Sequence, residues 1–570
     1  MNSQDIARVF KEIADILAIK GENPFRIRAY EKAAQNIESL GDELFTLIKE
    51  DKLTSVPGIG ADLANKIKEI AESGKLKAYE DLKKEIPPGV LDMLKIPGLG
   101  PKTVHAIYQK LKIDTIEKLE NAAKKGTLAE LEGVRVKTME NILKGIELIK
   151  KGGERTPLYF AANIAQEFLS QLKKVKEVDK IEAAGSLRRK KETIRDIDIL
   201  VTSEEPAKVM DTFTSLSMVK RVLAKGETKS SVIAQQNNMQ VDLRVVEKNC
   251  FGSALLYFTG SKQFNIKMRQ LAIKKGYKIN EYGVFKGEMR LAGKTEEEIF
   301  SLLKMAYVAP ELREDRGEVE AALKDSLPKL VELKDIKGDL HVHSTYSDGT
   351  MSIEKIANTA KDLGYEYIAV TDHSQTLKIA HGMDIKAVHK KIEELNKLNK
   401  KLKGIRVLCG MEVDILSDGK LDYPDSLLKE LDIVVAAIHS GFKQSREQLT
   451  ARTVAACKSK YVHIISHPTG RLWPERDAYD IDLEEVNRAA RDNKVALEIN
   501  CYHNRLDLND SHALAAKHAK VKLALGTDAH ILEQFRFMGL GVSVARRAWL
   551  EKKDVINCMK LEDLLKWLKK

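Results

Sequence analysis

Two aspartates, Asp196 and Asp198, lie inside an otherwise apolar run that extends to Val201. Side chains in a β-strand alternate between its two faces, so residues two apart point the same way. Two neighbouring carboxylates repel one another unless a cation lies between them. A third acid, Asp242, occurs in a similar run at residues 240–244. The pattern predicts paired strands that bring three carboxylates together. The alternative is that Asp196 and Asp198 are two solvent-exposed acids on an edge strand without a function.

A glycine-serine turn with two arginines, residues 184–189 (Ala-Gly-Ser-Leu-Arg-Arg), precedes these acids. Arginine suits phosphate because its planar guanidinium can engage two oxygens at once, so this turn can hold a triphosphate. Two divalent metal ions about 3.5–4 Å apart are the usual arrangement for in-line phosphoryl or nucleotidyl transfer. The turn and the three acids together predict a nucleotidyl-transfer site.

The length and composition are typical of a multidomain globular protein. At 570 residues the chain is too long for one core, and the usual domain size predicts roughly three or four domains. No apolar run approaches the roughly 20 residues of a membrane span, and no secretory signal is visible, so we expect no membrane partner. The five cysteines form no C-x-x-C pair, which is typical of reduced cytoplasmic thiols. The net charge of +11 suits a polyanionic partner without identifying it.

Two near-copies of one glycine turn occur in the first 150 residues, and a helical pattern follows each. The first contains Gly58 and Gly60, and the second contains Gly98 and Gly100. Such turns bring backbone N–H groups close to a phosphate at the positive end of the next helix. Contacts of this kind position a nucleic acid without reading its sequence. The repetition favours two DNA-backbone contacts over plain glycine caps, whereas a third copy at residues 131–135 lacks the second glycine and is interpreted as structural.

Histidine is concentrated in the C-terminal part, since only one of 13 histidines precedes residue 340. Short apolar strands alternate there with helical segments, and acids and histidines follow successive strands. Ligands at successive strand ends converge on the mouth of a parallel barrel. Imidazole with carboxylate suits zinc, manganese or iron better than magnesium. A lone histidine would favour a hydrogen-bonded core or surface residue, but a placed series favours a metal site. The predicted ligands are His341, His343, Asp348, His373, Glu412, His439, His467, Asp528 and His530.

Residues 1 to about 315 resemble the family X DNA polymerases of the DNA polymerase beta type. The resemblance rests on the glycine turns, the three aspartates and the hinge sequence Leu-Tyr-Phe-Thr-Gly-Ser at residues 256–261. It implies a lyase-like helical domain with the first helix-hairpin-helix at residues 1–90 and fingers with the second at 91–150. A nucleotidyltransferase palm would follow at 151–260 and a thumb at 261–315.

The resemblance also implies roles for single residues. Asp196 and Asp198 would bridge two Mg²⁺ or Mn²⁺ ions and Asp242 would bind the catalytic one. Tyr257 and Phe258 would select the sugar, although an aromatic pair is more often plain core. The implied nucleotide-binding residues are Arg155, Gly185, Ser186, Arg189, Tyr257, Phe258, Gly260, Asn265 and Arg269. The implied DNA-binding residues are Gly58, Gly60, Gly98, Gly100, Arg244 and Tyr282.

Lys66 stands at the position of the family's lyase lysine, which forms a Schiff base with an abasic sugar. That chemistry requires a lowered amine pKa. The family's 5′-phosphate pocket is lined with further basic residues, but Thr54, Asp62 and Ala78 occupy three of those positions here. Because a pocket short of cations should bind the phosphate poorly, the sequence favours a solvated surface lysine over a lyase nucleophile.

The C-terminal segment resembles the PHP (polymerase and histidinol phosphatase) phosphoesterases. The motifs are Asp-Leu-His-Val-His at residues 339–343, Thr-Asp-His at 371–373, Ile-Ser-His-Pro at 465–468 and Gly-Thr-Asp-Ala-His at 526–530. The resemblance implies a distorted seven-stranded β/α barrel with up to three Zn²⁺ or Mn²⁺ ions. His341, His343, Glu412 and Asp528 would hold one ion, Glu412, His439 and His467 the second, and Asp348, His373 and His530 the third. Further candidates are Arg471 for a phosphate contact and His503 for the pocket wall.

Together these patterns predict a multidomain fold, with all-α helix-hairpin-helix N-terminal domains, an α+β palm and thumb, a linker at residues 316–337 and a distorted (β/α)7 PHP barrel at 338–570. The predicted function is a monomeric, cytoplasmic repair polymerase that fills short gaps in primed DNA from dNTPs, as in base excision repair. Its PHP domain would act as a 3′-5′ exonuclease that processes 3′ ends, with abasic endonuclease activity as a further candidate. Two alternatives stay open. In the first, the chain is a polymerase whose PHP domain is a scaffold or a small-molecule phosphatase. In the second, the whole chain is a non-catalytic DNA-end binder.

Overall fold

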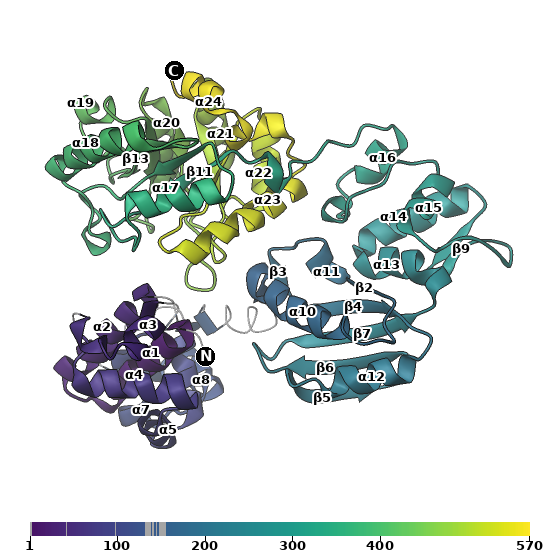
Figure 1. Cartoon of the computed structure of the whole chain (residues 1–570), viewed down its shortest axis with the longest axis horizontal. Coiled ribbons are helices and arrows are strands. Elements are labelled where there is room, and N and C mark those ends of the chain that lie inside the picture. Colours follow the sequence, from purple (N-terminus) through teal and green to yellow (C-terminus); the bar gives the residue numbers. More distant parts are fainter. Residues whose placement is uncertain are drawn as a thin grey trace. The chain divides into compact units, whose positions relative to one another are not determined.

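The structure is a computed structural model that describes residues 3–40, 43–56, 58–96, 99–131, 138–139, 142–143, 145–146 and 155–569. The chain divides into two compact units, the first spanning residues 1–153 and the second holding nearly all of residues 154–570 (Figure 1). No helix within the described ranges is both long enough and apolar enough to cross a membrane.

The first unit consists of helices and turns, with no strand among its described residues. Apolar side chains recur at helical spacing, and one core joins them from the first helix onward, with Phe10, Ile67 and Val104 fully buried. Its α-helices are α1 (Ser3–Lys20), α2 (Pro24–Leu40), α3 (Glu43–Lys49), α4 (Ala61–Ser73), α5 (Lys77–Lys84), α6 (Pro88–Asp92), α7 (Pro101–Leu111) and α8 (Ile116–Lys125). Short 3-10 helices are η1 (Leu53–Ser55), η2 (Met93–Lys95) and η3 (Thr127–Glu130).

The second unit begins with a five-stranded sheet in the order β2-β4-β7-β6-β5, in which only β4 and β7 pair in parallel. Ile197, Ile199 and Val201 alternate along β4 and pack into a core with α10 and α12, so the intervening aspartates face the other side. The elements are β1 (Thr156–Pro157), α10 (Leu158–Leu172), β2 (Lys180–Ala183), α11 (Gly185–Arg188), β3 (Thr193–Ile194), β4 (Asp196–Thr202), α12 (Pro206–Ser215), β5 (Val219–Lys225), β6 (Lys229–Ala234) and β7 (Gln240–Val246).

A smaller helical layer with an antiparallel three-stranded sheet follows the five-stranded sheet. Its core contains Phe264, Ile299 and Phe300, and it also takes in Val319 and Ala322 from the segment predicted as a linker. That segment therefore packs on this layer through α16. The elements are α13 (Phe251–Thr259), α14 (Lys262–Lys274), β8 (Lys278–Asn280), β9 (Gly283–Lys286), β10 (Met289–Ala292), α15 (Glu296–Leu302) and α16 (Glu318–Leu323).

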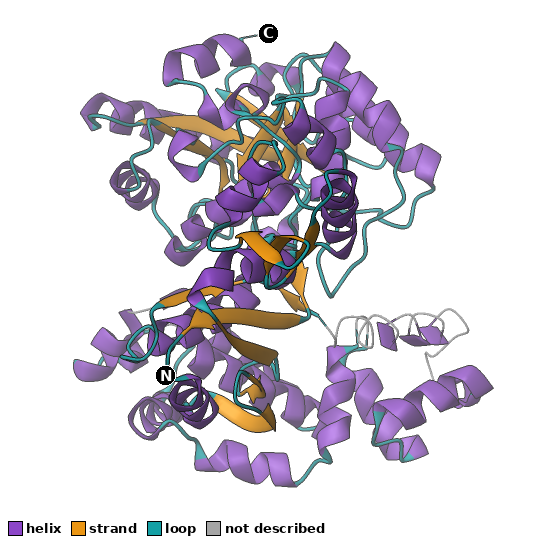
Figure 2. Cartoon of the chain, turned by 90° about the vertical axis from the view of Figure 1, so that its right-hand side faces the viewer, coloured by secondary structure: helices purple, strands orange, loops and turns teal. Residues whose placement is uncertain are grey.

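Seven parallel strands, β11 to β17, form the C-terminal sheet in sequence order. A bridge between Val342 and Ala529 joins the first strand to the last, so the ring is nearly closed and the predicted seven-stranded barrel is confirmed. Figure 2 shows these strands as a central group surrounded by helices. The strands are β11 (Gly338–Val342), β12 (Tyr367–Val370), β13 (Arg406–Asp414), β14 (Ile433–Ala437), β15 (Ile464–Ile465), β16 (Ala496–Asn500) and β17 (Leu523–Gly526). The α-helices are α17 (Ile353–Asp362), α18 (Ile385–Lys401), α19 (Asp425–Leu428), α20 (Arg446–Lys458), α21 (Leu483–Asp492), α22 (Asp510–His518), α23 (Met538–Arg547) and α24 (Leu561–Leu568).

Candidate active sites

The parallel pairing of β4 with β7 brings the three predicted aspartates together. Asp198 lies directly opposite Asp242, and Asp196 lies opposite Gln240. Gln240 Nε2 donates to Asp242 Oδ1 at 2.8 Å, and Lys229 Nζ lies 3.7 Å from Asp242 Oδ2. The Asp196 side chain is 42% exposed, whereas that of Asp242 is 13% exposed. The sheet therefore presents three partly exposed carboxylates on one face.

Asp198 lies in an environment that disfavours its charge. Its burial, together with the negative charges of Asp196 and Asp242, raises the pKa of its carboxyl to about 7. A divalent cation among these carboxylates would remove the repulsion. Carboxylate oxygens are the ligands that Mg²⁺ and Mn²⁺ prefer, so the donor set fits either ion.

Gly185 begins the glycine-serine turn directly beside Asp198. Its φ is +63°, and a Cβ added there would lie 2.5 Å from Asp198 Oδ2. Glycine is required on both counts, because it adopts positive φ freely and lets the turn approach the carboxylate. The close approach places Ser186 and Arg189, the predicted triphosphate ligands, next to the three acids.

Two arginines near this turn, Arg155 and Arg188, form different contacts. Arg155 donates to Thr193, from Nε to Oγ1 at 2.8 Å and from Nη2 to the carbonyl at 2.6 Å. Arg188 instead forms a two-pronged ion pair with the buried Glu296, at 2.9 and 2.7 Å. Burial alone would raise the pKa of Glu296, but Arg313 and Arg188 outweigh it and lower the pKa to about 2. Arg188 therefore joins the turn to α15.

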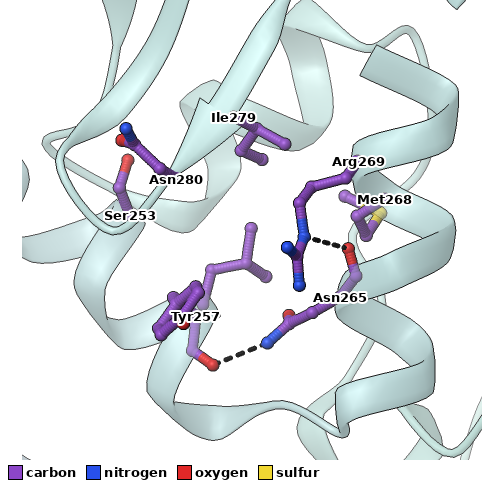
Figure 3. A pocket seen from close by; sticks show the side chains of 8 residues that line it. Ser253, Tyr257, Asn265, Met268, Arg269, Ile279 and Asn280 are labelled. Carbon is purple, nitrogen blue, oxygen red and sulfur yellow. Dashed lines mark hydrogen bonds between the residues drawn. The ribbon is translucent and has the colours of Figure 1, made fainter. Parts of the chain in front are cut away.

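A pocket between α13, α14 and β8 contains three of the predicted nucleotide-binding residues (Figure 3). Asn265 Nδ2 donates to the Tyr257 carbonyl at 2.7 Å, and Arg269 Nε donates to the Asn265 carbonyl at 3.3 Å. The predicted hinge Gly260 follows α13 with φ +68°. The side chains of Tyr257, Asn265 and Arg269 thus line one small pocket.

Phe258 lines a second pocket, beside β7, rather than the pocket of Tyr257. The guanidinium of Arg244 lies 4.5 Å from the centre of the Phe258 ring. Tyr282 lines the same pocket and is 60% exposed. The structure therefore brings Arg244 and Tyr282, both predicted to contact DNA, to one cavity next to the strand that carries Asp242.

The glycine turns of the first unit have the geometry of phosphate-binding helix starts. Gly60 precedes α4 and Gly100 precedes α7, both in extended conformation and without a side-chain cap. Gly58 has φ +86°, and a Cβ there would lie 3.1 Å from Lys32 Cδ. Gly98 and most of the third turn lie outside the described residues. The first N–H groups of α4, and those of α7 that follow Pro101, are the chemical features that suit a DNA phosphate.

Lys66, on α4, is less exposed than the expected surface lysine, with 19% of its side chain accessible. It forms an ion pair with Asp62, and its Nζ lies 5.9 Å from the centre of the Tyr30 ring. Burial alone would lower the pKa of the amine, but Asp62 and Tyr30 outweigh it and the pKa is raised. A Schiff-base amine needs the opposite shift, so this environment works against lyase chemistry.

Glu412 is the centre of the C-terminal cluster, at the carboxyl end of the barrel. Its Oε1 lies 3.0 Å from His467 Nε2 and 3.4 Å from His439 Nε2. Its Oε2 lies 2.9 Å from His373 Nδ1 and 3.4 Å from His341 Nε2. One carboxylate therefore touches imidazoles that come from four different strands, as the predicted convergence at a barrel mouth requires.

Three groups of side chains place their ligand atoms within 4.8 Å of one another. The predicted third set is among them with one addition, His343. Beside Glu412 and His439 the structure groups His373, and His467, which the resemblance implies there, also lies 3.0 Å from Glu412. The groups are His343, Asp348, His373 and His530; His341, His343 and Asp528; and His373, Glu412 and His439.

Several donor atoms of this cluster fit a bound metal. They are buried, yet no described residue gives them a hydrogen bond, which is rare and costly for buried polar atoms. Burial, with His530 and His373 nearby, lowers the pKa of His343 to about 4, so its imidazole is neutral, the form that binds a metal. The mixed nitrogen and oxygen donors fit Zn²⁺ or Mn²⁺. The atoms are His343 Nδ1 and His467 Nδ1, and also His373 Nδ1 and Glu412 Oε2, which lie 2.9 Å apart without the geometry of a hydrogen bond.

Two acids behind the cluster were not predicted from the sequence. Glu498 Oε1 lies 2.7 Å from His341 Nδ1, and Asp414 Oδ1 lies 2.8 Å from His439 Nδ1. Burial alone would lower the pKa of His439, but Glu412 and Asp414 raise it to about 10. Acids in this position fix the orientation of ligand imidazoles. A signal existed for Glu498, because an acid inside the apolar strand at residues 495–499 needs a buried partner.

Two predicted ligands have strained backbones. His467 has φ +27° and Asp528 has φ +54°, a region that residues other than glycine seldom adopt. Asn500 Nδ2 donates to Asp528 Oδ2 at 3.1 Å, and Arg505 Nε lies 3.5 Å from the same oxygen. Such strain is maintained by surrounding contacts and clusters at functional sites.

The two further candidates contact α10 and the residue before β3. Arg471 donates from Nη2 to Glu192 at 2.7 Å and from Nε to the Arg505 carbonyl at 2.6 Å. His503 stacks on Tyr502 and Tyr159, with ring centroids 4.8 and 5.5 Å apart. Both residues therefore join the barrel to the rest of the second unit.

One known protein matches the chain along its whole length. The chain is 40% identical over 574 residues to the DNA polymerase/3′-5′ exonuclease PolX of Bacillus subtilis (strain 168), and the match covers 100% of both chains. This chain belongs to the family X DNA polymerases that carry a C-terminal PHP domain.

Matches to individual domains agree with this family X assignment and confirm the predicted fold class. Residues 1–76 match a helix-hairpin-helix domain, 90–147 a SAM-like helix-hairpin-helix tandem, 254–314 the DNA polymerase beta thumb and 339–502 the PHP domain. DNA polymerase lambda of Rattus norvegicus is 26% identical over 54% of this chain and 56% of its own length. A probable phosphatase of Thermoanaerobacter sp. (strain X514) is 31% identical over 38% of this chain and 89% of its own length.

Proposed function

We propose that this family X polymerase extends primer 3′ ends in its palm, the five-stranded sheet, and removes 3′ nucleotides in its PHP barrel. The observation that carries the proposal is the presence of two separate metal-binding constellations in one chain. Three carboxylates gather on β4 and β7, and nine histidines and acids gather at the barrel mouth. The likeness to a protein named as both polymerase and 3′-5′ exonuclease supports the same division.

In the palm, Asp196 and Asp198 would hold both cations and Asp242 only the catalytic one. When bound, such cations neutralise phosphate charge and make the attacking 3′-hydroxyl more acidic. Ser186 and Arg189 would bind the triphosphate, since Gly185 brings their turn against Asp198. The pocket of Tyr257 and Asn265 would then orient the sugar and base, so that the α-phosphate lies in line with the primer end.

In the barrel, the nine ligands would hold up to three Zn²⁺ or Mn²⁺ ions. When bound, these ions generate a hydroxide nucleophile near neutral pH and polarise the phosphoryl oxygen. Glu498 and Asp414 would keep the imidazoles of His341 and His439 oriented during the reaction.

We infer further that gapped DNA in a repair pathway is the substrate, with abasic sites as a second target of the barrel. The helix starts at Gly60 and Gly100 offer two separate phosphate contacts, which suits the two sides of a short gap. The five cysteines form no disulfide, as expected for a protein of the reducing cytoplasm. A monomer is the simplest form, because each constellation is complete within one chain.

The decisive experiment incubates the protein with a gapped, 5′-phosphorylated duplex and Mn²⁺, with and without dNTPs. We expect filled gaps with dNTPs and shortened primers without them. Asp198→Ala should abolish extension and spare degradation, and His341→Ala should do the reverse. Extension that survives Asp198→Ala would contradict the palm assignment, and loss of extension in His341→Ala would contradict two independent sites.

A second candidate for the barrel is a small-molecule phosphatase, because the probable phosphatase of Thermoanaerobacter aligns over 89% of its own length. This alternative requires a free phosphomonoester to be hydrolysed faster than a DNA 3′ end. Comparing kcat/KM for a nucleoside monophosphate and for a 3′-recessed duplex decides between the two.

A further inference from the structure

Arg547, at the end of α23 in the barrel, connects the barrel to the palm. Its side chain is 2% exposed and is surrounded by acceptors. Nη1 donates to the Arg189 carbonyl at 2.8 Å and to Glu314 Oε1 at 3.0 Å. Nη2 donates to Asp510 Oδ2 at 2.6 Å. A barrel side chain therefore binds the backbone of the glycine-serine turn directly.

Glu314 links Arg547 to the side chain of Arg189. The same oxygen, Oε1, accepts from Arg189 Nε at 3.0 Å and from Arg547 Nη1. Lys191 Nζ lies 3.8 Å from the other oxygen. Burial alone would raise the pKa of Glu314, but Arg189, Arg547 and Lys191 outweigh it and lower the pKa. Glu314 is thus a buried anion shared between the palm and the barrel.

Arg189 is consequently fixed at both ends. Arg547 binds its carbonyl, while Glu314 and the Thr259 carbonyl bind its guanidinium. Only 12% of the Arg189 side chain is exposed. A side chain with several rotatable bonds loses affinity for its ligand unless its surroundings order it beforehand, and this cluster supplies that order.

We propose that Arg547 is a positioning residue for nucleotide binding, acting through Arg189. The inference rests on the proposed role of Arg189 as a triphosphate ligand. It means that the barrel supports the polymerase reaction by contact, independently of any hydrolysis in its own cluster. The neighbouring Arg546 offers a matched control, because it binds Glu311 at 2.7 Å and the Val331 carbonyl at 3.2 Å but does not contact Arg189.

The test compares Arg547→Met with Arg546→Met in the full-length protein, on primed DNA. We expect Arg547→Met to raise the KM for the dNTP about tenfold, with kcat changed less than twofold, the size expected when a charge-assisted phosphate contact is weakened. Arg546→Met should leave that KM within about twofold, since loosening the interface alone does not disorder Arg189. Equal increases in both variants would overturn the inference, as would an unchanged KM in Arg547→Met.

A double-mutant cycle with Arg189→Ala checks that the effect passes through Arg189. Once Arg189 is absent, Arg547→Met should raise the KM for the dNTP no further. If the KM of the double mutant instead rises by the product of the two single-mutant increases, the inference is overturned.

If Arg547→Met does not fold, Arg547→Lys replaces it. One ammonium cannot reproduce the forked contact, so KM should rise about threefold, and an unchanged KM would again overturn the inference. Wild-type protein that fails to extend primers would contradict the proposed function instead.

Discussion

The palm and the PHP barrel each gather charged ligands for cations, but they hold those ligands differently. In the palm, Asp196 is 42% exposed, and the hydrogen bond from Gln240 is the main side-chain support of Asp242. In the barrel, His341 is 1% exposed, and Glu498 holds its imidazole by a hydrogen bond to Nδ1. Protein contacts therefore orient the side chains of the barrel cluster, whereas the palm carboxylates are more open to solvent and would share their ion with the substrate phosphates.

The difference follows from what each site must bind. Mg²⁺ keeps several waters and is usually held by one or two carboxylates together with substrate phosphates. An open palm suits an ion that arrives with each nucleotide, because burial and the neighbouring charges that raise the pKa of Asp198 would be offset by that ion. Buried imidazoles with oriented partners suit ions that stay through many turnovers. We therefore expect substitutions around the ligands to be costly in the barrel and mild in the palm.

The largest effect should come from Glu412→Gln in the barrel. One carboxylate contacts His467, His439, His373 and His341, so its loss removes charge from more than one metal position. We expect exonuclease activity to fall about a thousandfold or more, because nucleophile generation depends on the bound ions. Metal content after dialysis, measured by mass spectrometry, should fall in parallel. Primer extension is the internal control and should persist, and exonuclease activity within tenfold of wild type would refute the central role of Glu412.

A smaller effect is expected from Glu498→Gln, which keeps the shape of the side chain but removes its charge. Glu498 also accepts hydrogen bonds from Ser466 Oγ at 2.7 Å and from the backbone N–H of His467 at 2.8 Å. Removing an orienting partner of a ligand imidazole costs about 10–100-fold in metal affinity or activity. Titrating the metal-free protein with Zn²⁺ or Mn²⁺ measures this loss directly.

Asp432→Asn is the matched control for Glu498→Gln. Asp432 accepts a backbone hydrogen bond from Cys409 at 2.8 Å, near the start of β14 and away from the ligand end of the barrel. This variant should bind metal as the wild type does. Equal losses in the two variants would mean that Glu498 acts through barrel stability and not through the orientation of His341.

The ligands could be predicted from the sequence because their placement follows local rules. Alternation along a strand predicts that Asp196 and Asp198 share a face, and the strand ends of a parallel barrel predict where His373 and His439 meet. Gly185 was predicted as part of a turn, and the close approach to Asp198 explains why it must be glycine.

The supporting contacts could not be predicted, because they join residues far apart in the chain. Arg188 and Glu296 are separated by 108 residues, and Arg547 and Arg189 by 358. Nothing in the flanking sequence distinguishes Glu296 or Arg547 from ordinary surface residues. His503 shows the converse, since its position after a strand suggested the pocket wall, but stacking on Tyr159 places it in an aromatic contact with the palm.

The smallest effect should come from Gln240→Leu, which removes the hydrogen bond to Asp242 in the palm. Asp242 can replace that donor with water because its site is open, so we expect kcat/KM for primer extension to fall only about two- to fivefold. Gln236→Leu is the control, since Gln236 lies just before β7 but donates to Glu167 on α10 at 3.1 Å and not to Asp242. Steady-state extension of a primed template measures both variants. A loss of thirtyfold or more in Gln240→Leu would mean that the palm depends on oriented ligands as much as the barrel does, and the contrast between the two sites would fail.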